Sequence, residues 1–352
     1  MSISKKGAYD RIMFEAIKGN RSLIDRISKD IKNNSLSHAY IIEGPRGSGR
    51  HTIALSTIAA LCCKSKNISG NNVPCGQCSA CKKILSGQSL DVKHITRDED
   101  RATLGIEAVR NIRDDVYISP IESDVKAYII NEAELLTLQG QNAFLLTLEE
   151  PPSYIVFFLI CENSSLLLET IRSRAPTLRT ERLCREDVEE FILKNDTRAA
   201  SLKDESPEEF DTLLSVSDGR IGYALELLNP KIRGQIFECR ETAKKIVLLL
   251  SDRDRTQAIA TVTSLSKNRQ EVTRQIVFLQ YALRDLILLK KSDDAPLCFY
   301  EDRDDALELA THFTSKALLA LYDASADAVS ELERNSNVRL TMLNMMRKAE
   351  LI

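Results

Sequence analysis

The segment from Gly44 to Thr52 has the glycine spacing of a phosphate-binding loop but lacks two of its chemical groups. A working loop reads G-x-x-x-x-G-K-[ST], in which backbone N–H groups surround the phosphates, the lysine reaches the β- and γ-phosphates, and the hydroxyl holds Mg²⁺. Arg50 and His51 stand at the lysine and hydroxyl positions. Three glycines retain the loop's shape: Gly44, Gly47 and Gly49. We therefore expect the loop fold to be retained and catalysis there to be lost.

The two substituted positions differ in what they can still do. The Arg50 guanidinium suits a bidentate contact with phosphate, so passive binding of ATP or ADP stays open. His51 is expected to be a solvated residue at the helix start, in preference to a ligand or a base.

A second phosphate-site element is altered at Asn131. A nucleotide-hydrolysing site needs an apolar strand that ends in an aspartate for Mg²⁺, followed by a glutamate that orients the attacking water. The matching run, from Ala127 to Ile130, is followed by Asn131 and Glu132, so the metal-supporting carboxylate is missing. Three altered positions together argue against turnover; the alternative is that these two residues merely end a buried strand.

Five of the nine cysteines fall between Cys62 and Cys81. Cys75, Cys78 and Cys81 are three residues apart, and tetrahedral thiolate coordination of Zn²⁺ requires a fourth thiol from Cys62 or Cys63. We favour Cys63, because Cys62 continues the apolar face of the preceding helix. Four cysteines leave no open position for water, so the predicted zinc is structural; reduced, metal-free cysteines are the alternative.

The length and net charge of the chain limit the number of domains and the classes of function to be expected. A chain of 352 residues is long enough for two or three domains. The formal charge of −3 gives no global argument for nucleic-acid binding, so DNA contacts would need a local basic face or partner chains. No stretch approaches the roughly 18 apolar residues of a membrane span, and we expect a cytoplasmic protein without membrane contact.

Strands and helices alternate through the first half of the chain. Strands are expected at 38–42, 91–96, 126–130, 155–160 and 176–180, with helices between them, the first of these at 52–60. This order predicts an α/β fold with a parallel sheet covered on both faces. After Glu181 the strand signal disappears: short helices are expected to about 228 and longer amphipathic helices from 231 onward.

Several segments together resemble bacterial clamp-loader subunits of the AAA+ superfamily, from DNA polymerase III. They are Ser37-His38-Ala39-Tyr40, Gly44 to Gly49, the four-cysteine module, Gln141 to Pro152, and Thr170-Ile171-Arg172-Ser173-Arg174. The motifs cover residues 8 to 228. The resemblance implies an AAA+ P-loop domain at 1–181 with a Cys₄ zinc module at about 62–85, a small helical lid domain at 182–230, and an all-α collar domain for oligomerisation at 231–352.

The altered positions indicate which of two kinds of clamp-loader subunit the chain resembles more. In the motor subunits (gamma/tau) a sensor arginine falls where this chain has Gly222, and the departures match the non-hydrolysing delta-prime subunit instead. The resemblance implies that Arg174, in Ser173-Arg174-Ala175, is an arginine finger that acts in trans on a neighbour's ATP. It lacks the cysteine that follows this arginine in the family motif.

The resulting hypothesis is a delta-prime stator that supports ATP-dependent loading of the sliding clamp on primed DNA and has no ATPase of its own. Its implied partners are the gamma/tau and delta subunits, with the clamp and primer-template DNA reached through the complex. The alternative is a divergent gamma/tau-type motor that hydrolyses ATP using Arg50. A free-standing zinc protein that binds nucleic acid is weaker, because no basic stripe with interleaved aromatics is present.

Overall fold

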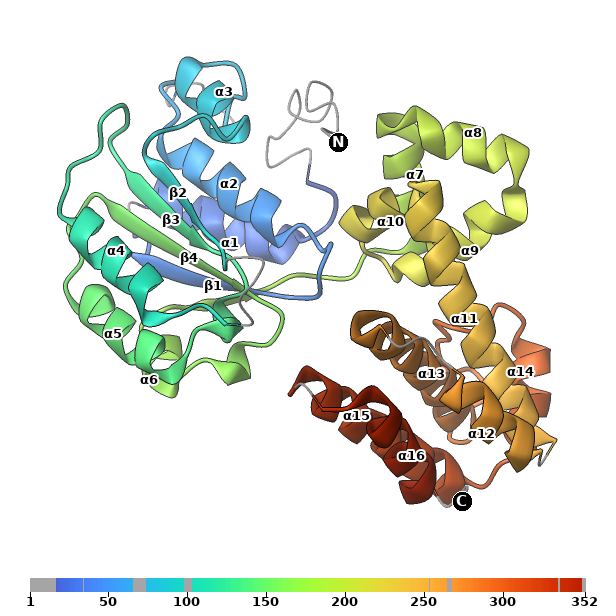
Figure 1. Ribbon diagram of the computed structural model, residues 1–352. Helices are drawn as coiled ribbons and strands as arrows, with labels where there is room; N and C mark the ends of the chain where they lie inside the picture. The colour runs from blue at the N-terminus through green and yellow to red at the C-terminus, as the bar shows by residue number, and fades with distance from the viewer. Residues whose placement is uncertain are drawn as a thin grey trace. The chain divides into compact units, whose positions relative to one another are not determined.

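The computed structural model describes residues 17–33, 35–65, 74–97, 103–252, 254–264, 268–334 and 336–349. The chain divides into two compact units, each described here by itself (Figure 1). Unit 1 comprises Met1–Thr197 with Gly219–Ala224, and unit 2 comprises Arg198–Asp218 with Leu225–Ile352. The three-domain division inferred from the sequence stays a prediction.

Unit 1 is built on a five-stranded sheet in which every pair of neighbouring strands is parallel. The order across the sheet is β2-β3-β4-β1-β5. The strands are β1 (Ala39–Glu43), β2 (Val92–Ile95), β3 (Lys126–Ile130), β4 (Ile155–Cys161) and β5 (Thr177–Arg179). The predicted α/β fold with a parallel sheet is confirmed.

Helices cover both faces of the sheet, as the near-continuous apolar strands require. On one face lie α1 (Arg21–Lys32), α2 (Arg50–Leu61) and α3 (Ser79–Leu85); on the other lie α4 (Ile106–Val116), α5 (Leu138–Glu149) and α6 (Glu169–Arg172) (Figure 1). Side chains alternate between the two cores: Tyr40 and Ile42 of β1 pack in the first, whereas Ala39 and Ile41 pack in the second. This alternation follows from the period of two in a strand.

Two short 3₁₀ helices, Ala133–Leu135 and Ser164–Leu166, follow β3 and β4, and α7 (Arg185–Asn195) completes the continuous part of unit 1. Helix α2 begins two residues earlier than expected from the sequence, at Arg50. Gly49 caps it with φ 88°, a left-handed conformation that a glycine adopts at little cost. His51 therefore lies inside the first turn of α2.

Unit 2 contains only helices among its described residues. They are α9 (Pro207–Ser217), α11 (Pro230–Ser251), α12 (Arg255–Thr263), α13 (Arg269–Leu289), α14 (Arg303–Thr311), α15 (Ser315–Glu333) and α16 (Val338–Lys348). Helix α8 (Thr197–Glu205) and helix α10 (Ile221–Leu227) each run from one unit into the other. The sequence predicts longer amphipathic helices from 231 onward, and in α13 the apolar residues of one face are buried: Val272, Ile276, Leu279, Leu283 and Leu286.

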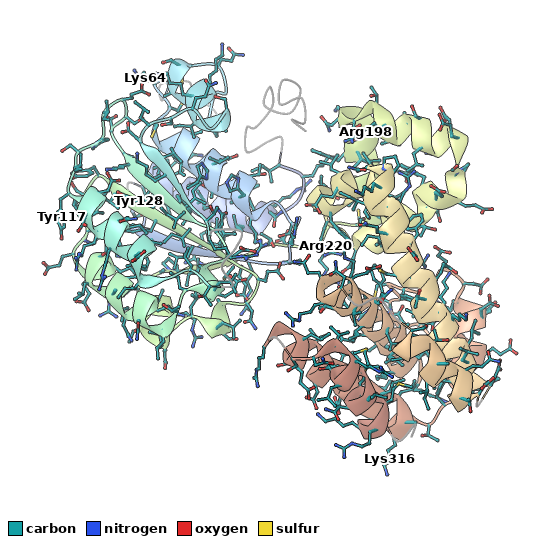
Figure 2. All side chains as sticks on the ribbon, viewed as in Figure 1. Lys64, Tyr117, Tyr128, Arg198, Arg220 and Lys316 are labelled. Atoms are coloured by element: carbon teal, nitrogen blue, oxygen red, sulfur yellow. The ribbon has the colours of Figure 1, made fainter. Side chains whose placement is uncertain are left out.

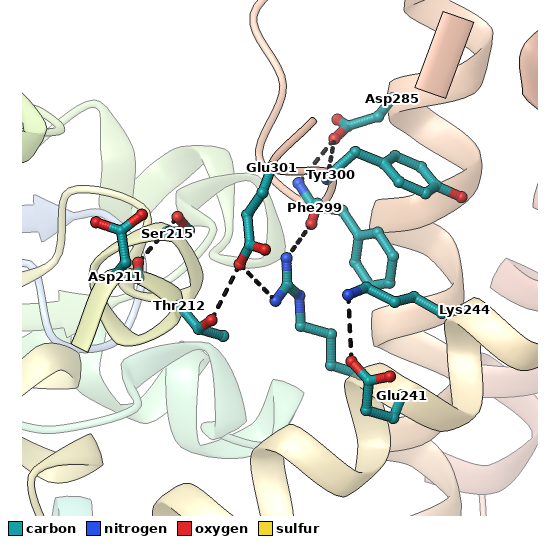
Figure 3. A network of polar contacts seen from close by, with 10 residues as sticks. Asp211, Thr212, Ser215, Glu241, Lys244, Asp285, Phe299, Tyr300 and Glu301 are labelled. Carbon is teal, nitrogen blue, oxygen red and sulfur yellow. Dashed lines mark hydrogen bonds and ion pairs between the residues drawn. The ribbon is translucent and has the colours of Figure 1, made fainter. Parts of the chain in front are cut away.

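A buried polar network holds the segment before α14 against α9, α11 and α13 (Figure 3). The Arg240 side chain is 3% exposed, and its Nη1 lies 2.8 Å from Glu301 Oε1. Thr212 Oγ1 of α9 donates to the same carboxylate at 3.0 Å, and Arg240 Nη2 donates to the Phe299 carbonyl. Asp285 of α13 accepts backbone N–H groups from the same segment. Because each buried charge is paired and hydrogen-bonded, the network fixes one arrangement of these elements.

Candidate functional site

The glycine-rich loop follows β1 and leads into α2, as the sequence predicts. Gly47 has φ 85° and Gly49 has φ 88°, so both positions favour glycine. Ser48 N–H donates to the Pro45 carbonyl at 3.2 Å and closes the turn. No side chain caps the start of α2, and the free N–H groups of a helix N-terminus are a site for anions. The backbone that would surround a phosphate is thus retained.

The first residues of α10 pack directly against this loop. Gly222 N–H donates to the Gly47 carbonyl at 2.9 Å. A Cβ added at Gly222 would lie 2.9 Å from both Cα and O of Gly47, and one added at Gly47 would lie 2.6 Å from the Tyr223 nitrogen. The backbones meet so closely that a side chain at position 222 has no room without a shift of α10 or the loop.

The Arg50 side chain faces the carboxylate of Glu162. Arg50 Nη2 lies 3.7 Å from Glu162 Oε1, and the Arg50 side chain is only 13% exposed. Glu162 directly follows β4, which is adjacent to β1 in the sheet. The group that could hold a phosphate therefore already faces a carboxylate within the chain.

His51 contacts a second histidine, so the expectation of a merely solvated residue is incomplete. Its ring stacks on that of His94 from β2, with ring centroids 5.2 Å apart. Nε2 of His51 lies 3.3 Å from Nδ1 of His94. Partial desolvation and the neighbouring His94 ring lower the pKa of His51 to about 4, and desolvation lowers the pKa of His94. The lowered pKa values favour the neutral form of both rings. Thr52, the last predicted residue of the loop, is half-buried in the same turn.

Asn131 and Glu132, predicted as the second half of the nucleotide site, directly follow the last residue of β3. Asn131 N–H donates to the Ile95 carbonyl at 2.9 Å and so continues the pairing with β2. Glu132 has φ 51°, an uncommon conformation for a residue with a side chain. Its carboxylate lies 3.0 Å from Arg97 Nε. The acid that would orient a water in a hydrolytic site is thus engaged by an arginine.

Arg174 lies two residues after the last residue of α6 and three residues before the first residue of β5. Its Nη1 donates to the Thr170 carbonyl at 3.0 Å, and its Nη2 donates to Glu149 Oε1 at 3.0 Å. The side chain is 36% exposed. These two partners hold the guanidinium in one orientation while part of it stays accessible.

Four thiols come together beside the C-terminal end of α2. The Sγ atoms of Cys63, Cys75, Cys78 and Cys81 all lie within 4.8 Å of one another, with Cys75 and Cys81 4.0 Å apart. Zn–S bonds of about 2.3 Å in a tetrahedron place sulfurs about 3.8 Å apart, so the donor set fits Zn²⁺. Cys62 caps α2 and packs in the core outside this cluster.

Hydrogen bonds within the module favour the thiolate at Cys75 and Cys78, whereas burial raises the pKa of Cys63 and Cys81. Cys78 N–H points to Cys75 Sγ at 3.4 Å, and Cys81 N–H points to Cys78 Sγ at 3.5 Å. Burial raises the pKa of Cys75, but N–H groups from Cys78 and Gln77 outweigh it and lower that pKa to about 6. Lys64, next to Cys63, is exposed at this end of unit 1 (Figure 2). The cluster has the residues of a structural metal centre.

Sequence reasoning missed the partners of the predicted residues. Glu162, His94 and Glu149 each contact one of them, yet they lie 25 to 112 positions away in the chain. One signal was available for Glu162, since the residue that follows a buried parallel strand meets the other strand ends at one sheet edge. Nothing in the local sequence indicates the contact between His51 and His94.

The chain is similar to bacterial replication proteins. Residues 19–183 match the family described as "DNA polymerase III, delta subunit". DNA polymerase III subunit tau of Bacillus subtilis is 26% identical over 344 residues, covering 93% of this chain and 59% of that protein. Subunit gamma of Buchnera aphidicola subsp. Schizaphis graminum is 31% identical over 215 residues, covering 61% of this chain and 57% of that protein. The chain thus spans a little under three fifths of these relatives' length.

A solved structure has a more distant likeness. A DNA polymerase III gamma subunit-related protein from Thermotoga maritima is 18% identical with a TM-score of 0.46, covering 93% of this chain and 98% of that chain. Within the part of the chain that the structure describes, no helix combines the length and the apolar character that crossing a membrane requires.

Proposed function

We propose that this chain, an AAA+ subunit of the clamp-loader kind, is the delta-prime stator of the DNA polymerase III clamp loader. In this role it has no ATPase of its own and donates Arg174 to the ATP of an adjacent gamma/tau subunit. The observation that carries the proposal is the contact of Gly222 with Gly47, because it leaves no room for the sensor arginine of a motor. Arg50, paired with Glu162, and the neutral Asn131 support the same conclusion.

Arg174 is suited to a finger because its charge is oriented and partly accessible. The bonds to Thr170 and Glu149 reduce the number of orientations that its long side chain can adopt. A positive charge fixed in advance stabilises charge that develops on a transferring phosphoryl group. Arginine fingers contribute about 10³- to 10⁵-fold to turnover at the site they serve.

The test is DNA-stimulated ATPase of a clamp loader reconstituted from this chain with its gamma/tau and delta partners. We expect Arg174→Ala to abolish hydrolysis at the one site that this chain contacts and to lower clamp loading. Arg172→Ala, an exposed arginine two positions earlier, is the matched control and should keep both activities. Wild-type ATPase and clamp loading in a fully assembled Arg174→Ala complex would disprove the finger.

The alternative function is a divergent gamma/tau-type motor that uses Arg50 in place of lysine. The retained loop and the uncapped start of α2 favour it to the extent that a phosphate could still bind there. The isolated chain decides between the two functions. Steady-state ATPase that disappears in Glu132→Gln would establish the motor, and its absence at saturating ATP supports the stator.

The four cysteines are proposed to hold one structural Zn²⁺. The wild-type chain should contain one zinc ion that Cys78→Ser releases, whereas Cys62→Ser should retain it. Equal stability of zinc-loaded and chelator-treated protein would refute a structural role.

The delta subunit, the sliding clamp and primer-template DNA are proposed as partners through the assembled complex, in the cytoplasm.

A further inference from the structure

His51 and His94 meet because of where helix α2 and strand β2 begin and end. His51 lies one turn before Leu55 of α2, which packs on the sheet. His94 lies two residues after Val92, so both point to the face of the sheet that α2 covers. Strand β2 is one of the two edge strands, and both imidazoles keep exposed surface there. The pair is therefore held by two regular elements and is open to solvent.

The separation of the two ring nitrogens matches that of two ligands of one metal ion. A Zn–N bond is about 2.0 to 2.1 Å, which in a tetrahedral complex places two nitrogens about 3.3 to 3.4 Å apart. Nε2 of His51 and Nδ1 of His94 are 3.3 Å apart. Neutral imidazole is the form that binds transition metals.

We propose that His51 and His94 form a two-imidazole site for a divalent transition-metal ion, Zn²⁺ in the first instance, with water at the remaining positions. The site is separate from the four-cysteine module. His51 is in the first turn of α2 and Cys63 follows its last turn, so about 15 to 18 Å of helix separates them. A site with two protein ligands and open positions is weaker and more exchangeable than a closed Cys₄ site.

The imidazole nitrogen distinguishes this site from the Mg²⁺ site of a working phosphate loop. Mg²⁺ prefers oxygen ligands in a near-octahedral arrangement, whereas imidazole favours Zn²⁺, Ni²⁺ and Cu²⁺. The replacement of a hydroxyl by His51 thus changes the class of metal that the start of α2 can bind. The proposal does not depend on the stator assignment, because it requires only the two rings.

Equilibrium dialysis of the full chain against Zn²⁺ at neutral pH tests the proposal. We expect wild-type protein to bind one more zinc ion than His51→Gln or His94→Gln. Each substitution should weaken that ion at least about tenfold, because even loss of an outer-shell partner costs about 10- to 100-fold. His312→Gln, at an exposed histidine of α14's C-cap in unit 2, is the matched control and should bind as much zinc as the wild type.

The measured quantity is the difference in bound zinc between the wild type and each variant. This difference is the same whether or not the cysteines carry zinc. Retention of the wild-type thermal unfolding midpoint in both glutamine variants shows that the loss is local. Equal zinc binding by the wild type and both variants would overturn the site and leave an imidazole–imidazole hydrogen bond. Loss on His51→Gln but not on His94→Gln would also overturn it, since both rings are required.

Discussion

Replacing Asp285 by alanine should remove a buried polar anchor of unit 2. The carboxylate is fully buried, and its Oδ2 accepts the N–H groups of Phe299 at 2.7 Å and Tyr300 at 3.3 Å (Figure 3). Oδ2 also accepts the Cys298 N–H at 2.9 Å. Asp285→Ala leaves the buried Phe299 N–H without its acceptor at a cost of about 1 to 3 kcal/mol. The two half-buried N–H groups add about 0.5 to 1.5 kcal/mol each. We expect a total loss of about 2 to 6 kcal/mol.

Urea unfolding followed by the helical circular dichroism signal measures this loss. Asp285→Asn keeps one acceptor oxygen without the charge, so its loss should lie between those of the wild type and Asp285→Ala. Asp323→Ala, at an exposed position of α15, should change the free energy of unfolding by no more than about 0.5 kcal/mol. A loss below about 1 kcal/mol for Asp285→Ala would show that water replaces the carboxylate and would refute the reasoning.

Three further predictions concern other parts of the chain. Gly222→Ala places a Cβ against the Gly47 backbone, and the strain of about 1 to 3 kcal/mol should speed hydrogen exchange of the loop on the order of tenfold; unchanged exchange would contradict it. Cys184 is the one exposed cysteine of the nine, so a thiol reagent should modify the zinc-loaded native protein first at this position, and Cys184→Ser should prevent this first modification. Burial raises the pKa of Asp115, but hydrogen bonds from Lys126 and Tyr128 outweigh it and lower that pKa. The carboxylate therefore stabilises the fold above its unfolded pKa of about 3.9, and urea titrations should show the difference from Asp115→Asn shrinking as pH falls below that value.

Much of unit 1 could be predicted because local signals and long-range structure agree there. The buried strands are apolar runs bounded by polar residues, and alternating strands and helices leave a parallel sheet as the consistent arrangement. Three positions of the phosphate loop have positive φ, and one of them also caps α2. All three are glycines at the spacing that the sequence shows: Gly44, Gly47 and Gly49. The predicted ligand spacing from Cys75 to Cys81 likewise lies within one turn and one short helix.

The sequence by itself determined the individual strands, the loop, the cysteine spacing and the three altered positions, since each depends on residues close together in the chain. Only the tertiary structure decided what those residues face. It paired Arg50 with Glu162, stacked His51 on His94 and set Gly222 against the Gly47 backbone. These contacts join residues at the carboxyl ends of the parallel strands with residues at the starts of helices. The meeting depends on strand order and register, which no local pattern of residues specifies.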